Sequence, residues 1–398
     1  MGWYDLERMP DKSAPPTRVG YIPTLDGWRA LAVFAVIIYH DKVRRIGPIS
    51  DSFVHKFGHL GVDLFFAISG ILICSRLLDE EYSNHQISLS GFYIRRFCRI
   101  LPPAWLFLGT LAVLGIAHVV PVGLSAWFAA FAFVQNYYQV HLHSLPSSLV
   151  TDAYWYTGHF WSLAVEEHFY LILPGILYLF RKSRIAILVS IIVVVFVYGV
   201  IIHSNPAWID LMGGGESAIR RTELRINALL FPALLAILLR KHGFHRFSMR
   251  WLRPVVVIPV LGFLFGAVAL FILKAHLANS GLILLLADFG FPFLILCTML
   301  HPASYVSRFL ELRPLRHLGK ISYSIYLWQQ LFFIREQTSI SATWWPIHAL
   351  QSFPWSLIAV LVIANASYYF VERPFMRLGH RLAPPATPGR SELKAVPS

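Results

Sequence analysis

Charged residues are scarce in this chain. Asp, Glu, Lys and Arg together make up 14% of the 398 residues, whereas a soluble domain carries about a quarter. Hydrophobic residues reach 56%, and the mean hydropathy is +0.58. Apolar runs of about 20 residues, enough to cross a hydrocarbon core of about 30 Å, recur along almost the whole length. This composition excludes an ordinary soluble domain and predicts an all-α protein that crosses the membrane many times.

Cysteine is also rare, with Cys74, Cys98 and Cys297 scattered along the chain. No two of them have the spacing of metal ligands, so we expect neither a disulfide framework nor a metal site. No internal repeat is visible in the sequence. The inverted-repeat signature of many secondary transporters is therefore not supported.

The hydropathy pattern predicts about ten membrane spans. They cover residues 25–44, 58–78, 99–120, 159–180, 185–203, 223–240, 254–274, 280–300, 317–335 and 354–376. A further apolar piece, residues 127–138, is too short to cross and is expected to form a re-entrant or interfacial helix. We expect one membrane domain over residues 21–378, a polar segment before it (1–20) and a Pro-rich, disordered tail after it (379–398).

The net charge of +13 reflects topology in this interpretation. Basic runs such as "RKSR" at 181–184 and the segment 240–253 fall on one predicted side of the membrane, which the positive-inside rule makes cytoplasmic. Both termini are then cytoplasmic, and we expect no nucleic-acid partner. The longest outer segment, 121–158, has no Lys or Arg but many aromatic residues. These residues could stack on sugar rings or form an aromatic belt at the lipid headgroups.

The first predicted span, "TLDGWRALAVFAVIIYHD", holds two ionisable groups, Arg29 and His40. Eleven residues turn a helix by about three full turns, so both side chains share one face, about 16 Å apart along the axis. Charged groups within a span are costly unless they are paired or face a hydrated interior. The shared face favours a polar path through the bundle over side chains that snorkel to the membrane surface. Arg225 is a further ionisable group within a predicted span.

The second predicted span begins with another ionisable group, Asp63, which we place in the same layer of the membrane as His40. A carboxylate beside an imidazole can orient it and stabilise its protonated form, as a general base requires. The alternative is a buried pair that only holds two neighbouring helices together.

Two more clusters of polar residues lie near predicted span ends. Arg96 and Arg99 share a helix face, and their planar guanidinium groups suit phosphate oxyanions; the alternative is that they are ordinary membrane anchors. Ser162, Glu166 and Glu167 enter the fourth predicted span, where two glutamates are costly. Because adjacent residues cannot share one helix face, we expect one glutamate to point into the bundle and the other toward a neighbouring helix.

Six motifs, taken in order, resemble the membrane acyltransferase 3 family over residues 25–375. They are "LDGWRALAVFAVIIYH", "GVDLFFAISGILI", "RRFCRILPP", "FWSLAVEEHFY", "GKISYSIYLWQQ" and "VERPF". The resemblance implies an enzyme of the bacterial cytoplasmic membrane that moves an acyl group, commonly acetyl, from cytoplasmic acyl-CoA to a hydroxyl. Family acceptors include surface polysaccharides, peptidoglycan, oligosaccharides and macrolide sugars. No permanently bound cofactor is implied.

The resemblance also assigns roles to residues at the first two motifs. The family's arginine and histidine fall on Arg29 and His40, with the histidine as the proposed base, and its acidic residue falls on Asp63. One departure concerns the ninth predicted span. Many relatives carry histidine after Tyr-Leu-Trp, whereas Gln329 stands here, so a mechanism that needs a second histidine at this position is in doubt.

At the next motifs, the family's Arg-x-x-Arg, implicated in handling the CoA donor, falls on Arg96 and Arg99. Its serine and paired glutamates fall on Ser162, Glu166 and Glu167. Longer relatives append an SGNH-type hydrolase domain that the sequence lacks. We therefore expect this chain to act alone or to pass the acyl group to a separate partner enzyme.

The mechanism implied is base catalysis by His40, with the phosphates of acyl-CoA on the paired arginines. Candidate donors for the developing oxyanion are Arg29, Ser162 and Tyr323, and an acyl-enzyme on Ser162 or His40 is the alternative route. The rival class is a transporter or proton-coupled carrier that uses the same buried ions as a relay. A third interpretation is an assembly partner in a glycan-export complex. The acceptor and the acyl length stay open.

Overall fold

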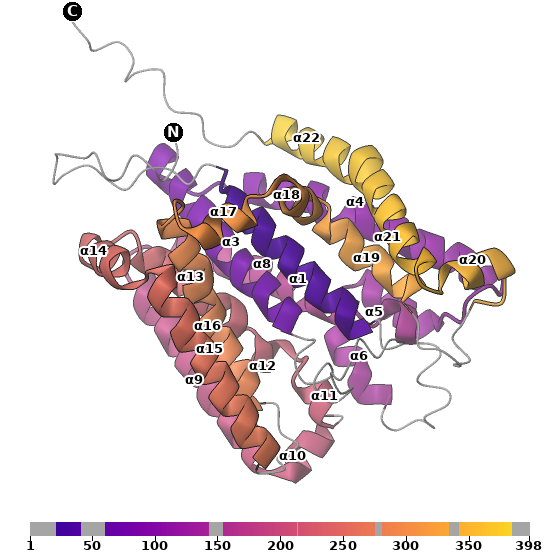
Figure 1. The fold of residues 1–398 in the computed structure, drawn as a ribbon, viewed down its shortest axis with the longest axis horizontal. Helices are drawn as coiled ribbons and strands as arrows, with labels where there is room; N and C mark the ends of the chain where they lie inside the picture. The colour runs from indigo at the N-terminus through magenta and orange to yellow at the C-terminus, as the bar shows by residue number, and fades with distance from the viewer. Residues whose placement is uncertain are drawn as a thin grey trace, which may run out of the picture.

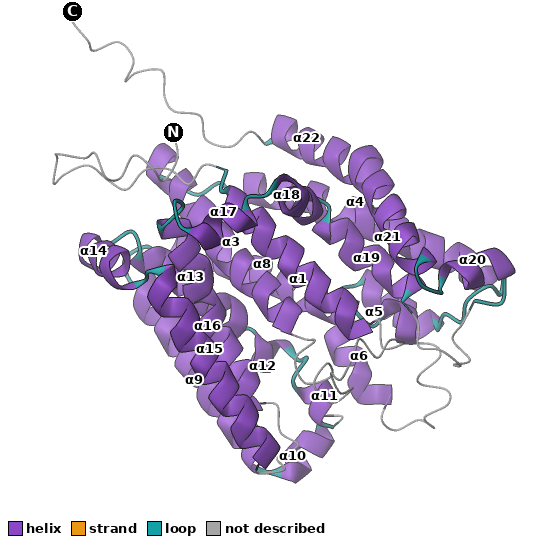
Figure 2. Ribbon diagram, in the orientation of Figure 1, coloured by secondary structure: helices purple, strands orange, loops and turns teal. Residues whose placement is uncertain are grey.

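The computed structural model describes residues 21–40, 60–142, 154–212, 214–274, 281–333 and 342–383. Within these ranges the regular elements are all helices (Figure 2), as the sequence predicts. The cytoplasmic location of the termini stays a prediction. The predicted segment 1–20 and residues 384–398 of the predicted tail 379–398 lie outside the described residues, whereas residues 379–382 belong to a helix.

Five helices surround the centre of the bundle. They are α1 (Pro23–His40), α3 (Leu60–Asn84), α4 (Leu89–Ile116), α8 (Phe160–Leu179) and α19 (Ser322–Phe332). Of these, α3 is the most enclosed: it contacts α1, α8, α13 and α16. Its apolar residues occur all around the helix, as expected for a helix buried on every side.

A second group of helices packs beside α3 and runs steeply across the lower left of Figure 1. It contains α9 (Arg184–Ser204), α13 (Asn227–Leu238), α15 (Pro254–Lys274) and α16 (Gly281–Leu300). Contacts between α9 and α13, α13 and α16, and α15 and α16 hold the group together. The C-terminal rod on the opposite side consists of α21 (Trp355–Ser367), the π-helical turn η3 (Tyr368–Glu372) and α22 (Arg373–Leu382).

Short helices connect or cap these rods. They are α5 (Leu124–Phe131), α6 (Gln135–Leu142), the 3₁₀ turn η2 (Trp155–Thr157), α10 (Pro206–Leu211), α11 (Gly215–Ala218), α12 (Thr222–Arg225), α14 (His242–Trp251), α17 (Tyr305–Leu310), α18 (Arg313–Lys320) and α20 (Trp345–Leu350). The predicted re-entrant piece 127–138 falls on α5 and α6, which are separated at Phe133, a residue in left-handed conformation with φ of 54°.

By length and composition, four of the described helical segments can cross a membrane: Leu60–Asn84, Leu89–Ile116, Arg184–Ile202 and Trp355–Leu382. A fifth is the pair Gly243–Trp251 and Pro254–Gly266, if this pair, bent by 76°, counts as one span. Several other predicted spans are interrupted: 223–240 is divided between α12 and α13, and 317–335 between α18 and α19. The figure of about ten spans therefore stays a prediction, while the protein is an all-helical membrane protein.

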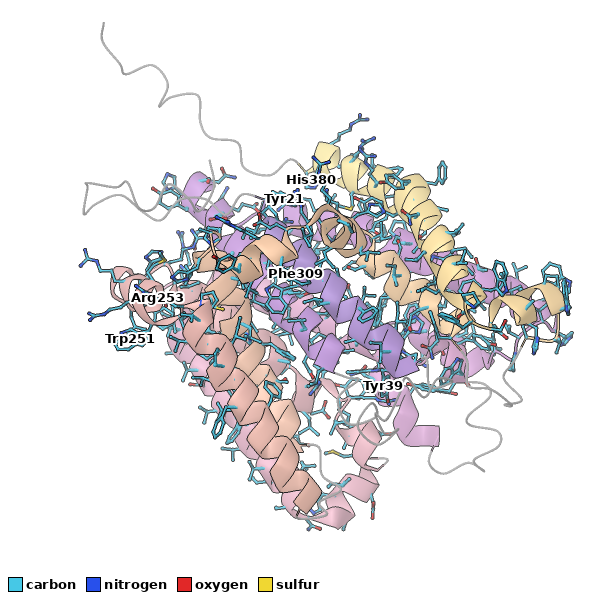
Figure 3. All side chains as sticks on the ribbon, viewed as in Figure 1. Tyr21, Tyr39, Trp251, Arg253, Phe309 and His380 are labelled. Carbon is cyan, nitrogen blue, oxygen red and sulfur yellow. The ribbon has the colours of Figure 1, made fainter. Side chains whose placement is uncertain are left out.

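The ends of α1 mark two different regions of the molecule. In Figure 3, Tyr21 lies at the same end as His380 of α22, and Tyr39 lies at the far end of α1. At the Tyr21 end, α18 approaches α1 so closely that a Cβ on Gly319 would stand 1.8 Å from the Asp26 carbonyl oxygen. Only glycine fits at this contact, which fixes α18 against the start of α1.

Candidate active site

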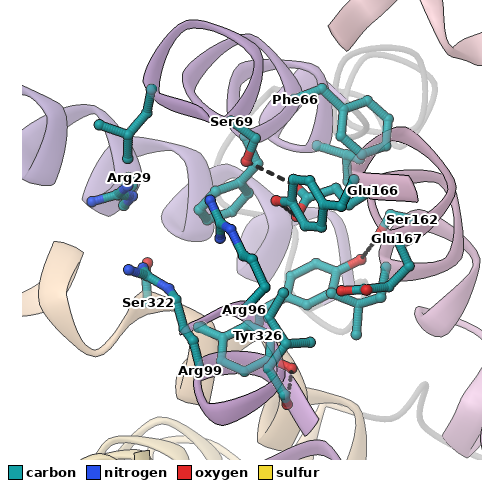
Figure 4. A pocket seen from close by; sticks show the side chains of 17 residues that line it. Arg29, Phe66, Ser69, Arg96, Arg99, Ser162, Glu166, Glu167, Ser322 and Tyr326 are labelled. Atoms are coloured by element: carbon teal, nitrogen blue, oxygen red, sulfur yellow. Dashed lines mark hydrogen bonds between the residues drawn. The ribbon is translucent and has the colours of Figure 1, made fainter. Parts of the chain in front are cut away.

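A polar pocket of about 80 Å³ lies at the centre of the bundle (Figure 4). Its walls come from α1, α3, α4, α8 and α19, which lie far apart in the sequence. Seven of the residues named from the sequence line it: Arg29, Arg96, Arg99, Ser162, Glu166, Glu167 and Tyr323. The remaining three, His40, Asp63 and Arg225, are not among the residues that line it.

Three guanidinium groups face one another on one side of this pocket (Figure 4). Arg29 pairs with Asp26 one turn earlier on α1, at 3.1 Å, and its side chain is 17% exposed. The Arg96 guanidinium lies 4.5 Å from the centre of the Tyr170 ring. In the described part of the chain, no carboxylate lies within ion-pair distance of Arg96 or Arg99. Arg29 therefore faces a polar interior rather than lipid, and Arg96 and Arg99 are placed to receive an anion.

Both glutamates of α8 line the pocket, so the expectation that they would point to different sides is wrong. Glu166 accepts hydrogen bonds from the hydroxyls of Ser69, at 3.1 Å, and Tyr170, at 2.8 Å. Glu167 lies close enough to Arg96 to interact with it electrostatically. Adjacent positions on a helix differ by about 100°, but the long side chains reach a pocket wide enough to span that angle. The carboxylates offset part of the positive charge of the three arginines.

Hydroxyl groups line the pocket toward its other side. Ser162 Oγ lies 2.5 Å from the Tyr326 hydroxyl, which lies 3.0 Å from the His159 carbonyl. Ser162 Oγ lies 3.1 Å from the same carbonyl, so one of the two hydroxyls donates to the carbonyl while the other donates to its neighbouring hydroxyl. The Tyr323 hydroxyl instead donates to the Ile100 carbonyl at 2.9 Å. Of the two hydroxyl residues named as oxyanion donors, Tyr323 thus has its proton committed to the backbone, whereas Ser162 belongs to a chain of hydroxyls.

His40 lies at the last residue of α1, beyond the pocket. Its Nδ1 lies 3.0 Å from the Val36 carbonyl. Since a carbonyl only accepts, Nδ1 carries the proton in this contact, and Nε2 is the basic nitrogen of the neutral ring. The imidazole meets the Trp155 ring edge-on, with centroids 6.2 Å apart. The orientation that a general base requires is therefore supplied here by the helix backbone and an aromatic ring.

Asp63 does not orient His40, which corrects the sequence-based hypothesis. Its Oδ1 instead forms a buried ion pair with Arg225 of α12. Asp288 of α16 lies 4.0 Å from the same guanidinium. A fixed guanidinium is a stronger partner for a buried carboxylate than a neutral imidazole, because it compensates the full charge. The structure thus favours the alternative that Asp63 holds neighbouring helices together.

The sequence did not single out several residues of this region. Ser69 and Tyr170 line the pocket and donate hydrogen bonds to Glu166. A signal was available for Tyr170, which follows Glu166 at i+4 and so shares its helix face. His159, although it opens the fourth predicted span, was not assigned a role; its buried ring contacts the Tyr326 ring with centroids 5.5 Å apart.

Gln329, where relatives often carry histidine, is fully buried, and its amide donates to Gln330 Oε1 at 3.4 Å. Gln330 in turn donates to the Trp155 carbonyl at 3.0 Å. These two amides therefore support the turn that carries Trp155. Among the described residues, no group of three His, Cys, Asp or Glu side chains could hold a metal ion.

Comparison with known proteins identifies the family of this chain. A family model described as an acyltransferase domain matches residues 22–370. The chain belongs to the acyltransferase 3 family. The chain is similar to the peptidoglycan O-acetyltransferase OatA of Listeria monocytogenes serovar 1/2a, with 30% identity over 391 residues, covering 90% of this chain and 56% of the relative. No solved structure matches it.

A second relative is the O-acetyltransferase OatA of Staphylococcus aureus strain NCTC 8325, at 27% identity over 372 residues, covering 91% of this chain and 58% of the relative. The chain thus spans little more than half the length of these curated relatives. The match contains the segments that build the pocket, because all five helices that line it fall within residues 22–370.

Proposed function

We propose that this protein is an integral membrane O-acyltransferase of the bacterial cytoplasmic membrane. It moves an acyl group, acetyl in the first instance, from cytoplasmic acyl-CoA to a carbohydrate hydroxyl on the opposite side. The observation that carries this proposal is the central pocket, in which arginines stand at one side and hydroxyls at the other, while His40 lies beyond it at the end of α1. The names of the relatives point to a glycan such as peptidoglycan as the acceptor.

The donor end of the reaction follows from the arginines. We place the Tyr21 end of α1 on the cytoplasmic side, with about ten spans and both termini cytoplasmic, in keeping with the positive-inside rule. The diphosphate of acyl-CoA then lies near Arg99 at the mouth of the pocket, and the pantetheine arm extends past Arg96 and Glu166 toward Ser162. Because the pocket holds only about 80 Å³, the lining side chains must move apart to admit this arm.

The chemical step is a direct transfer. His40 Nε2 removes the proton of the acceptor hydroxyl, whose oxygen attacks the thioester carbonyl carbon. The carbon–sulfur bond then breaks, and the CoA thiolate leaves with the proton that His40 received. Base catalysis of this kind typically contributes 10²–10⁴-fold. Ser162 and Tyr326 lie where a hydroxyl could donate to the developing oxyanion.

The carrier alternative is less well supported. A relay through the predicted Asp63–His40 pair is not favoured, because Asp63 is paired with Arg225, whose guanidinium also lies 4.0 Å from Asp288. A family defined by acyltransferase domains also favours the enzyme. A separate partner enzyme can receive the acyl group before the final acceptor.

The test uses the purified protein in liposomes. Acyl-labelled CoA is enclosed with the protein, and peptidoglycan glycan strands are added outside. We expect label to appear on the glycan with one CoA thiol released per acyl group. Stable label on the protein itself, without acceptor, would contradict direct transfer and favour an acyl-enzyme on Ser162 or His40. Transport of an unmodified solute without CoA release would favour the carrier.

A further inference from the structure

A second cavity, of about 550 Å³, adjoins the central pocket at the Tyr21 end of α1. The two cavities share Arg29 and Arg99 in their linings. The walls of the second cavity come from the start of α1, from α3 and α4, from α18, and from η3 and α22. We call it the basic vestibule. A ligand that extends from the vestibule to the pocket therefore passes beside these two arginines.

Positive charge dominates the vestibule. Its lining contains seven permanently cationic side chains, namely Arg29, Arg76, Arg99, Arg313, Arg316, Lys320 and Arg373. The two carboxylates among the lining residues are Asp26 and Glu372. Like charges in one cavity repel one another unless an anion joins them. An empty vestibule is therefore electrostatically unfavourable, and a polyanion would relieve that repulsion.

Membrane anchoring does not account for the arrangement on α18. An anchoring cation extends outward to lipid headgroups, whereas three of these side chains line a cavity. The Arg316 guanidinium lies 5.5 Å from the centre of the Tyr21 ring, and Lys320 Nζ lies 5.7 Å from it. Arg316 also donates to the Tyr21 hydroxyl at 3.3 Å, and that hydroxyl donates to Asp26 at 2.5 Å. Tyr21 thus holds both cations at the cavity wall.

We propose that the basic vestibule binds the 3′-phosphorylated adenosine diphosphate end of acyl-CoA, with Arg313, Arg316 and Lys320 as phosphate ligands. This inference rests on the proposed function, because it takes acyl-CoA as the donor. That end of the molecule carries roughly four negative charges, since a terminal phosphate carries nearly two. The vestibule supplies an excess of cations on the same scale, and Tyr368 and Tyr369 provide rings on which an adenine can stack. The adjoining pocket lies where the pantetheine arm must go.

The experiment measures binding to the full chain in nanodiscs of neutral lipid, by titration calorimetry. The probes are CoA, dephospho-CoA, which lacks the 3′-phosphate, and adenosine 3′,5′-bisphosphate alone. We expect the wild type to bind CoA at least tenfold more tightly than dephospho-CoA. Arg316→Gln should weaken CoA binding about tenfold and reduce the preference for the 3′-phosphate. Lys320→Gln is a second variant that keeps the Arg316–Tyr21 contact.

The matched control is Arg250→Gln, which removes an exposed cation of α14 outside the vestibule. If its effect equals that of Arg316→Gln, the cations act only through general surface charge and the assignment fails. The assignment also fails if the wild type binds CoA and dephospho-CoA equally and no vestibule variant changes either affinity; acyl transfer from CoA would then survive. A second set of nanodiscs contains anionic lipid; if this lipid abolishes binding of CoA and adenosine 3′,5′-bisphosphate, the vestibule ligand is a lipid headgroup and the proposal is overturned. Absence of acyl transfer in liposomes would instead refute the proposed function.

Discussion

The two ends of α1 differ in the kind of polar side chains that surround them. At the Tyr21 end, cations line a cavity and meet carboxylates, as at Arg29 and Asp26. At the His40 end, imidazole, indole and amide groups lie among aromatic rings. Among the described residues, buried polar atoms of Trp155, His159, Trp328 and Gln329 have no hydrogen-bond partner.

This difference has a physical meaning. Positive charge attracts a polyanion at long range and does not require a close geometric fit. Buried neutral donors and acceptors instead cost free energy until a partner of the right geometry arrives, because each was removed from water. We infer that the Tyr21 end binds the charged acyl donor and that the His40 end binds the hydroxyl groups of the acceptor. The experiments below test that contrast, from the largest expected effect to the smallest.

Removal of the imidazole at the His40 end should have the largest effect on turnover. His40→Ala is expected to lower kcat for acyl transfer by about 10²–10⁴-fold, the usual contribution of a general base. Affinity for CoA should stay unchanged, since His40 lies outside the pocket. Steady-state kinetics and calorimetry together measure both. The exposed His348 of α20 provides the control, as His348→Ala; a turnover loss shared by both variants would contradict a specific role.

Disruption of the Asp63–Arg225 pair should affect stability rather than either end of α1. Arg225→Leu leaves Asp63 and Asp288 buried without a cation, which typically costs about 3–5 kcal/mol. Thermal unfolding in detergent micelles measures this loss. Arg225→Lys, which keeps the charge, should recover part of it. If Arg225→Leu unfolds at the same temperature as the wild type but is inactive, the result would instead support a catalytic role for Asp63.

The close approach of α18 to α1 can be tested through Gly319. A Cβ there would overlap the backbone of Asp26, and overpacking of this kind costs about 1–3 kcal/mol. Gly319→Ala should therefore lower the unfolding temperature and displace the vestibule wall, which weakens CoA binding. Gly243→Ala on α14, where a Cβ meets no atom within 4 Å, is the matched control. Equal unfolding temperatures for both variants would refute the close contact.

Loss of one pocket arginine should change donor affinity more than turnover. Arg99→Gln removes a cation shared by the pocket and the vestibule, and each charge-assisted hydrogen bond contributes about 1.5–3 kcal/mol. KM for acyl-CoA should rise about tenfold or more, with a smaller change in kcat. Competition by CoA against a labelled donor checks the binding step. A change confined to kcat would place Arg99 in the chemical step instead.

The smallest expected effect comes from removal of the Trp155 indole N–H at the His40 end. Trp155→Phe keeps an aromatic ring against the imidazole but removes the indole N–H, which lacks a partner among the described residues. KM for the glycan acceptor should rise a few-fold, consistent with one hydrogen bond of about 1 kcal/mol, while KM for acyl-CoA stays constant. An equal rise for both substrates would show that the ring position, not the N–H, had changed.

Much of the candidate site could be predicted from local patterns. Their position within predicted spans identified Arg29, Glu166 and Glu167, because a charged side chain in lipid is costly unless it is paired or faces a polar interior. The partner of Asp63 could not be predicted in this way. Arg225 follows it by 162 positions, and no helical periodicity relates residues on different helices. The same limit applied to Ser69, an inconspicuous serine that becomes a ligand of Glu166 only when α3 packs beside α8.

The sequence by itself determined that this is a helical membrane protein of the acyltransferase 3 family, since hydropathy and ordered motifs are properties of a linear chain. The tertiary structure decided which charges meet. It joined Asp63 to Arg225, placed Arg29 and Arg99 in the walls of two cavities, and brought His40 against the Val36 carbonyl and Trp155. The physical reason is that electrostatic and hydrogen-bond energies depend on distances of a few ångströms, which only the packing of helices sets.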